Sequence, residues 1–460
     1  MTAGCDGLPM PRRLLAITAI SFGTALSVID GAIANVALPT IARDLGTDRS
    51  SAVLVATIYQ LVLVMALLPL SALGQQIGLK RMYQGGQTLF AVATLLCFFS
   101  NSLPFLLVVR AFQALGAAAA MSVATALLRQ IYPAKHLGRG LGVHSIVITV
   151  SASIAPTLGG GVLAIAPWPW VFASAIPFAL LSLAFGRALP EVEQRQEKYD
   201  LAAAAMCAAM FGFVIAGLES GMQGDSPMVS AFVILIGVSI GFVFVRRELG
   251  QAEPIMPVDL LGRPVIALSA IGALTAFIGQ MLLFVSLPFR LEQDFGLSPA
   301  EVGAVIAPWP MVMIFVAPAA GFLSDRYPAG LLGGIGMAIS VIALLALAWP
   351  PPDASYFDLA WRMALCGAGF GLFQAPNVRL LISSAPRHRS AAAGGLVPTV
   401  RLTGQTLGAT CASALLAIGA ADGKLPALVA AGLCLVAGLT SIARLRPRPE
   451  HDDAIVAAYP

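Results

Sequence analysis

Asp30 and Arg110 are the two residues whose charge and position best suit them to chemistry. Asp30 lies about eight residues, or roughly 12 Å, from the end of its apolar stretch, and Arg110 lies about six residues, or roughly 9 Å, beyond Pro104. Because both depths are measured from the same end, the two side chains are expected to meet. A carboxylate can bind and release a proton, whereas a guanidinium stays charged. The pair therefore predicts proton coupling in which Asp30 titrates and Arg110 tunes it, with an ion pair that merely orients helices as the alternative.

The patterns of the commoner chemical sites are missing from the sequence. Its four histidines are not spaced as metal ligands, and its six cysteines are far apart, so neither a metal cluster nor a disulfide framework is expected. No G-x-x-x-x-G-K-S/T pattern occurs, so ATP is not the expected energy source. We therefore expect a protein that is not an enzyme, uses no cofactor or metal, and draws its energy from a proton gradient.

The elements that must position these residues are membrane helices. Of the 460 residues, 58% are hydrophobic and 11% are charged, whereas soluble domains have about 45–50% apolar and about 25% charged residues. Apolar runs recur along the chain, and lipid offers no partner for backbone N–H and C=O groups. The sequence predicts an all-α integral membrane protein whose spans lie near 14–38, 51–74, 83–100, 104–128, 140–165, 168–186, 201–219, 228–245, 264–288, 300–323, 330–349, 357–381, 396–420 and 425–443.

The basic residues predict the orientation of these fourteen spans. Of the 27 Lys and Arg residues, most fall in segments on one side of the membrane, and three lie inside spans or near their ends. The segments on the other side hold only Arg43, Arg49, Arg290 and Lys424. Because basic residues favour cytoplasmic loops, both termini are expected in the cytoplasm, in a plasma or inner membrane that the chain crosses many times.

The sequence also contains an internal repeat. Landmarks recur roughly 250 residues apart, namely Leu38-Pro39 with Leu287-Pro288, the segment 71–78 with 321–328, and Arg110 with Arg362. The first six and the last six spans therefore look like two parallel copies of one bundle. The expected units are an N-terminal six-helix bundle at 1–190, two inserted helices at 191–263, a C-terminal six-helix bundle at 264–445, and a cytoplasmic tail at 446–460.

Two motifs around the charged pair resemble those of the fourteen-span drug:proton antiporter family of the major facilitator superfamily. Residues 29–39, IDGAIANVALP, are similar to L-D-x-T-V-x-N-V-A-L-P, with Ala32 in place of Thr. Residues 110–116, RAFQALG, resemble R-x-x-Q-G-x-G, with Ala114 in place of the first Gly. The resemblance covers nearly the whole chain and implies the major facilitator fold, with two inserted helices between its two bundles.

A third motif, residues 155–160, reads APTLGG and is similar to the antiporter signature G-P-x-x-G-G. Proline kinks a helix, and glycines let another helix approach closely. Pro156, Gly159 and Gly160 therefore predict a seam between the two halves. A generic packing face of small residues is the alternative.

The fourth motif is a loop that resembles G-x-L-A-D-R-x-G-R-K, which in the family holds a charge lock on the cytoplasmic gate. In the first half, Gln75 replaces the acid, and the expected gate residues there are Gln75, Gly78, Lys80 and Arg81. The second copy keeps the acid, and its expected gate residues are Gly321, Asp325 and Arg326. The first lock is therefore expected to be the weaker one.

Polar and aromatic residues inside the spans are candidates for a substrate cavity, with ordinary helix packing as the alternative. They are Tyr59, Gln60, Gln113, Gln280, Trp309, Arg362, Gln374 and Asn377. Asp30 is the single deep acid, while Glu219 is expected at the end of its span and Arg401 either inside a span or at the inner surface. A neutral or singly charged amphipathic substrate is therefore expected.

These observations predict a secondary active transporter that exports small amphipathic compounds in exchange for protons by alternating access. Its expected partners are a small-molecule substrate, protons and the lipid bilayer, with no nucleic acid, and the chain is expected to be a monomer. A proton-coupled importer is the nearest alternative. A membrane-embedded enzyme is the alternative from another class, and it would need clustered nucleophiles or metal ligands at one membrane face.

Overall fold

The computed structural model describes residues 7–133, 137–191, 199–222, 226–249, 251, 256–351, 354–385, 390–420 and 423–445. Across these residues all regular secondary structure is helical, as expected for a chain that satisfies its backbone hydrogen bonds in lipid. The expected tail at 446–460 lies outside the described residues.

The first part of the chain folds into seven helical segments. They are α1 (Met10–Asp44), α2 (Arg49–Ile77), α3 (Leu79–Phe98), α4 (Leu103–Ile131), α5 (Leu137–Ile165), α6 (Pro169–Ala173) and α7 (Ile176–Gly186). The short α6 and the longer α7 together occupy the single span expected at 168–186. The helix breaks between them, where Pro177 in the first turn of α7 lacks the N–H group that would continue the preceding helix.

The remaining helices begin with a pair, α8 (Leu201–Met222) and α9 (Pro227–Glu248), followed by a 3-10 turn, η2 (Val258–Gly262). The last part contains α10 (Pro264–Asp294), α11 (Pro299–Ile306), α12 (Pro308–Leu323), α13 (Ala329–Ala348), α14 (Tyr356–Ser383), α15 (Ser390–Ala417) and α16 (Leu425–Ala443). Pro308 divides α11 from α12 within the span expected at 300–323. Each of the fourteen expected ranges thus contains one helix or two helical segments.

Ten helices in the described part of the chain are long and apolar enough to cross a membrane, counting α6 with α7 and α11 with α12 as single crossings. The other four expected spans are α3, α5, α14 and α15. These helices include buried polar side chains, such as Gln87 and Thr94 of α3, which face protein rather than lipid. A number of spans above ten therefore stays a prediction.

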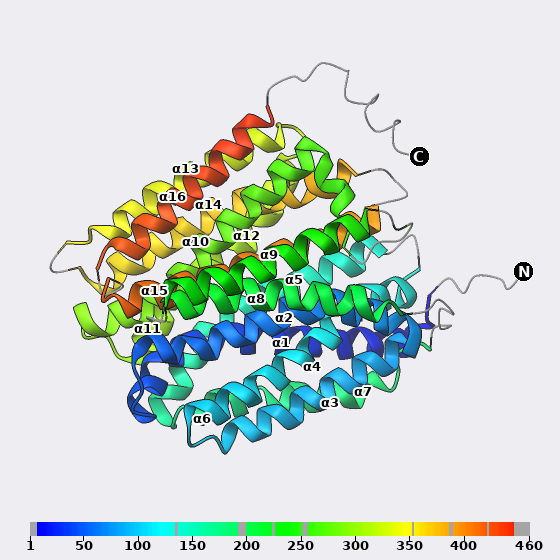
Figure 1. Cartoon of the computed structure of the whole chain (residues 1–460), viewed down its shortest axis with the longest axis horizontal. Helices are drawn as coiled ribbons and strands as arrows, with labels where there is room; N and C mark the ends of the chain where they lie inside the picture. The colour runs from blue at the N-terminus through cyan, green and yellow to red at the C-terminus, as the bar shows by residue number, and fades with distance from the viewer. Residues whose placement is uncertain are drawn as a thin grey trace, which may run out of the picture.

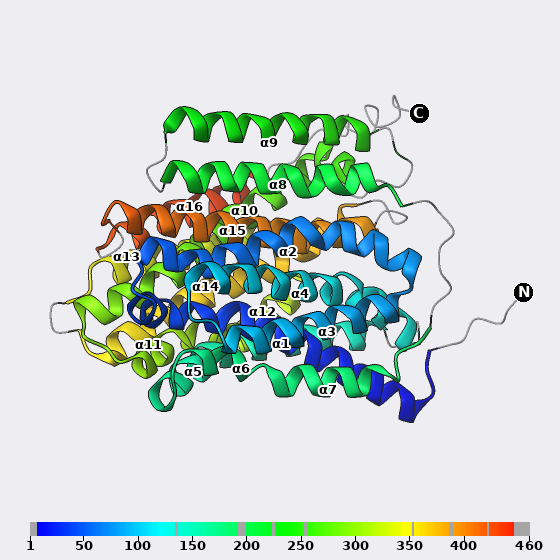
Figure 2. The same cartoon turned by 60° about the horizontal axis from the view of Figure 1, so that its bottom comes forward.

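The helices run side by side in a bundle (Figure 1). In Figure 2, α8 and α9 form a separate layer with α9 outermost. Helix α9 packs on α8, and α8 packs on both α2 and α15. The early and late helices meet where α2 packs on α15, where α5 packs on α11 and α12, and where α1 packs on α10. We call residues 7–191 the N-terminal half and residues 256–445 the C-terminal half.

Two turns at corresponding positions of the halves have the same backbone geometry. Gly46 follows α1 with a φ of 62°, and Gly296 follows α10 with a φ of 63°. Asp48 and Ser298 then cap α2 and α11, each with φ −67° and ψ 158°. A positive φ favours glycine, so the shared glycines have a physical reason. We call the end of the bundle with these two turns the Gly46 end, and the opposite end, with the α2–α3 turn, the Gly78 end.

Candidate functional site

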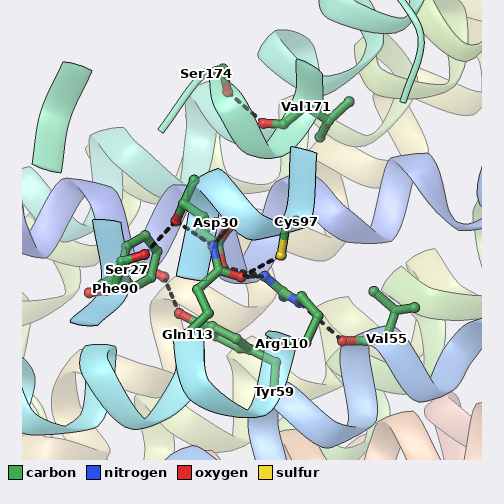
Figure 3. A network of polar contacts seen from close by, with 11 residues as sticks. Ser27, Asp30, Val55, Tyr59, Phe90, Cys97, Arg110, Gln113, Val171 and Ser174 are labelled. Atoms are coloured by element: carbon green, nitrogen blue, oxygen red, sulfur yellow. Dashed lines mark hydrogen bonds and ion pairs between the residues drawn. The ribbon is translucent and has the colours of Figure 1, made fainter. Parts of the chain in front are cut away.

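A buried ion pair joins α1 to α4. Arg110 Nη1 lies 2.6 Å from Asp30 Oδ2, and neither side chain is accessible to solvent. The contact expected from the depth of the two residues is therefore present (Figure 3). Charge-assisted hydrogen bonds of this length are the strong ones, and removal of either partner would leave an uncompensated buried charge.

Gln113, one turn after Arg110 on α4, completes the network around Asp30. Its Nε2 donates to Asp30 Oδ1 at 3.0 Å and to Thr94 Oγ1 at 2.8 Å, while its Oε1 accepts a hydrogen bond from Arg110. Figure 3 shows Cys97 directed at the same amide oxygen, with its Sγ 3.7 Å away. Both carboxylate oxygens of Asp30 therefore have partners.

Aromatic rings enclose the guanidinium of Arg110. Its Cζ lies 4.3 Å from the centroid of the Tyr59 ring and 5.0 Å from that of Phe172, within the range of cation–π attraction. The Tyr59 hydroxyl donates to the backbone oxygen of Ser27 at 3.3 Å. Nη2 of Arg110 is buried and has no partner among the described residues. The ion pair is therefore held in a dry site with one donor unused.

A cavity of about 190 Å³ lies next to this site, between the two halves. Its lining comes from α1, α2, α4 and α5 on one side and from α10, α11, α12, α14 and α15 on the other. Five of the predicted cavity residues line it, namely Tyr59, Gln60, Gln280, Trp309 and Gln374. Arg401 and Gln405 of α15 also line it. Tyr59 is shared between the cavity and the ion pair, whereas Asp30 itself does not reach the cavity.

Three predicted cavity residues, Gln113, Arg362 and Asn377, are not among the residues that line this cavity, and their contact with a substrate stays a prediction. Gln113 turns toward Asp30 instead. Arg362 sits near the start of α14, where its Nη1 donates to the backbone oxygen of Asp358 at 2.9 Å. Asn377 is bound near the Gly78 end, where its Oδ1 accepts from Arg444 at 2.6 Å. Arg362 and Asn377 lie toward the two ends of α14, whose middle part lines the cavity, whereas Gln113 lies on the face of α4 that meets α1.

The α5 motif lies where the two halves touch. A methyl group added to Gly159 would meet Ile33 of α1, and one added to Gly160 would lie 2.6 Å from the backbone oxygen of Pro299 in α11. On the opposite side of this contact, Gly303 of α11 packs directly on the backbone of Pro156. These small residues let helix backbones from the two halves approach closely.

The gate loops differ between the halves. In the second, Asp325 pairs with Arg379 of α14, and Arg379 Nη1 also donates to Ser324 Oγ at 2.8 Å. Arg326, the neighbour expected to act with Asp325, is exposed. The positive charge that pairs with Asp325 therefore comes from α14, which is distant in sequence but lies beside the loop. The sequence of the loop alone does not reveal this partner. Gly321 has open space around it.

In the first half, Lys80 pairs with Glu191 at 3.4 Å, after the end of α7. Gly78 has a φ of 101°, which suits glycine at this sharp turn. Gln75 and Arg81 are exposed. In the first loop, Lys80 thus forms an ion pair with the segment after α7. In the second loop, the residue that forms the ion pair is the acid, Asp325.

Comparison with known proteins supplies the family. The family model of the Major Facilitator Superfamily matches residues 20–409 and, in a second match, residues 270–458. The chain belongs to the Major Facilitator Superfamily. It is 42% identical over 434 residues to a protein of Escherichia coli (strain K12) described as uncharacterized transporter YebQ, covering 94% of this chain and 95% of that protein.

A more distant relative is the methyl viologen resistance protein SmvA of Salmonella typhimurium, which is 28% identical over 403 residues, covering 87% of this chain and 81% of SmvA. Among solved structures, a bacterial homolog of the human lysosomal transporter Spinster, in an inward-facing and unoccupied conformation, matches with a TM-score of 0.68 and 18% identity, covering 96% of this chain and 100% of that one. At this identity the match concerns the fold alone. The chain is thus a multi-pass membrane transporter of the Major Facilitator Superfamily.

Proposed function

We propose that this chain exports small amphipathic compounds across the inner membrane in exchange for protons. It would do so with fourteen spans, arranged as two six-helix bundles and the inserted pair α8–α9. The observation that carries the proposal is a buried titratable group, Asp30, whose partner Arg110 lies against Tyr59, and Tyr59 lines a cavity between the two halves. The name of SmvA, a resistance protein, supports export over import.

Contacts between the halves at the Gly46 end support alternating access. Arg43 of α1 lies 3.5 Å from Glu292 of α10, and Ser413 of α15 donates to the backbone oxygen of Ser50 at 3.3 Å. The glycine contact between α5 and α11 lies at the same end. These contacts describe a conformation closed at the Gly46 end, which we assign to the outside of the cell. Export requires them to separate while contacts form at the Gly78 end.

Protonation of Asp30 supplies a means to couple this exchange to the gradient. A neutral carboxyl would leave Arg110 buried without its counter-charge, which is strongly unfavourable. The network of Gln113, Tyr59 and Arg110 must then rearrange, and Tyr59 links that rearrangement to the cavity. One pH unit supplies about 1.4 kcal/mol per proton and 100 mV supplies about 2.3 kcal/mol per charge, enough to sustain a substantial export gradient.

The test is uptake of three fluorescent amphipathic dyes, one cationic, one neutral and one anionic, into inside-out membrane vesicles energised by a proton gradient, with a protonophore as the reference. Asp30→Asn preserves volume but cannot titrate, so the variant should reach the membrane at normal levels and lose protonophore-sensitive uptake. Asp44→Asn removes an exposed acid from the same helix and should transport normally. Normal uptake by Asp30→Asn would remove Asp30 from the mechanism.

The alternative of a proton-coupled importer predicts movement in the opposite direction in the same vesicles. An accelerated loss of preloaded substrate, driven by the gradient, would favour import. For the alternative of a membrane-embedded enzyme, the transporter family and the fold provide no support.

A further inference from the structure

The cavity between the two halves has an unbalanced charge. Among the described residues that line it, Arg401 alone is charged, and no Asp or Glu is among them. A ligand that enters this space therefore meets a single fixed positive charge. Because low-dielectric protein walls surround this space, that charge acts more strongly on a ligand than it would at the surface.

Arg401 makes no hydrogen bond or ion pair with any residue that the structure describes, and its Nε is buried without a partner. Arg401 is half-buried, and a charge that has lost part of its hydration is costly unless something pairs with it. The guanidinium is also a planar fork of donors that matches a carboxylate, sulfonate or phosphate group. Its unused donors next to the cavity therefore indicate an anionic group on the ligand.

Two of the buried acids that the structure describes, Asp30 and Glu219, are engaged away from Arg401. Asp30 is enclosed by Arg110 and Gln113. Glu219 of α8 bonds Ser413 at 2.8 Å, and Ser413 lies about twelve residues, or roughly 18 Å, further along α15 than Arg401. Among the described residues, His144 of α5 is a titratable group that interacts electrostatically with Arg401, and its ionised form is a cation.

The rest of the lining favours an aromatic ligand with hydrogen-bonding groups. The ring of Trp309 lies 5.2 Å from Phe284 and 5.7 Å from Phe370, and these three rings form one apolar wall. Nε1 of Trp309 is a buried donor without a partner, and Oε1 of Gln60 is a buried acceptor without one, among the residues described. Flat rings can stack on such a wall, while the unpaired polar atoms are available to orient the ligand.

We infer that the cavity binds a compact aromatic compound with one anionic group, which pairs with Arg401 while its rings lie against Trp309, Phe284 and Phe370. The inference deepens the proposed function, because it takes the cavity as the transport site and names the substrate class. The inferred preference for an anion differs from that of a transporter whose cavity binds a cation through an Asp or Glu side chain.

Binding to the purified full-length protein tests this inference without requiring transport. The probes are three naphthalenes of similar shape, namely 2-naphthalenesulfonate, uncharged 2-naphthalenesulfonamide and cationic 2-naphthyltrimethylammonium, measured by isothermal titration calorimetry. The sulfonate should bind at least about tenfold more tightly than the other two, as expected for a charge-assisted bond in a water-poor site. Arg401→Gln should abolish this preference, and Arg401→Lys should retain part of it. Arg187→Gln removes an exposed positive charge and should leave it unchanged.

The order of the three affinities in the unaltered protein is decisive even where a variant fails to fold. Preference for the cation, equal affinities, or no binding of any probe would overturn the inference. A sulfonate preference that survives in a folded Arg401→Gln variant would overturn the role of Arg401. Protonophore-sensitive transport of any of the three dyes alongside these results would leave the proposed export intact.

Discussion

Gly160→Ala tests whether α5 forms the seam between the halves. The added methyl carbon would lie 2.6 Å from the backbone oxygen of Pro299 and 2.9 Å from Cα of Ala300. Carbon and oxygen atoms approach to about 3.3 Å, so α5 and α11 must separate by roughly 0.7 Å. Both atoms that would be met belong to the backbone, so no side chain can rotate away.

Overpacking of this kind costs about 1–3 kcal/mol. The cost applies to the conformation closed at the Gly46 end, because the contact joins the two halves there. The ratio of open to closed conformers should therefore rise about 5- to 150-fold. Gly161→Ala is the matched control, since a methyl group at Gly161 meets nothing within 4 Å. Alanine is also the better helix former, so this control should be neutral or mildly stabilising.

The assay is modification of a single cysteine at Ala32, which lines the cavity, in a background without the native cysteines. A membrane-impermeant maleimide added to intact cells reports how often the cavity opens at the Gly46 end. Modification should accelerate in Gly160→Ala and stay at the parental rate in Gly161→Ala. Equal rates in all three proteins would show that the α5–α11 contact does not control opening.

Three further changes probe the gate, the buried network and the turn at the Gly46 end. Gln75→Asp restores the acid that the first gate loop lacks and should slow cysteine modification at the Gly78 end about fivefold for a bias of about 1 kcal/mol; Gln75→Asn should not. Gln113→Leu should lower stability by about 1–3 kcal/mol, because buried charged atoms lose partners; an unchanged melting temperature in a fluorescence assay would contradict this. Hydrogen bonds from Ser50 and Ser51 lower the pKa of Asp48 to about 2, so the stability that Asp48 adds is present above its unfolded pKa and lost as pH falls toward 2. The melting temperature of Asp48→Ala should therefore lie below that of the parent at pH 7 and converge with it near pH 2; a gap independent of pH would argue against capping by the ionised form.

The buried pair of charged residues was identifiable from the sequence. Asp30 and Arg110 stood out because a charge in an apolar run is costly, and their depth along each helix follows from a fixed rise per residue. Their contact at 2.6 Å agrees with that estimate. Pro156 and Gly160 stood out for a similar reason, since small and kinking residues are useful only where another backbone comes close.

Rotation about each helix axis and the choice of neighbours were decided by the tertiary structure. Gln113 was expected in the cavity but binds Asp30, because it lies one turn from Arg110 on the same face of α4. Asp325 was expected to act beside Arg326 but pairs with Arg379, which α14 brings across the loop.

Arg401 illustrates the same division between sequence and structure. Its place in an apolar run was visible in the sequence, but its position at the cavity and its lack of an acidic partner among the described residues appear only once α15 is packed against the N-terminal half. A sequence that is apolar almost throughout determines where helices form and how deep each polar residue lies, because lipid demands internal backbone hydrogen bonds. Such a sequence gives only a weak signal for which face of each helix turns toward the protein, because lipid and the protein interior are similarly apolar. Close packing between helices decides which face turns inward.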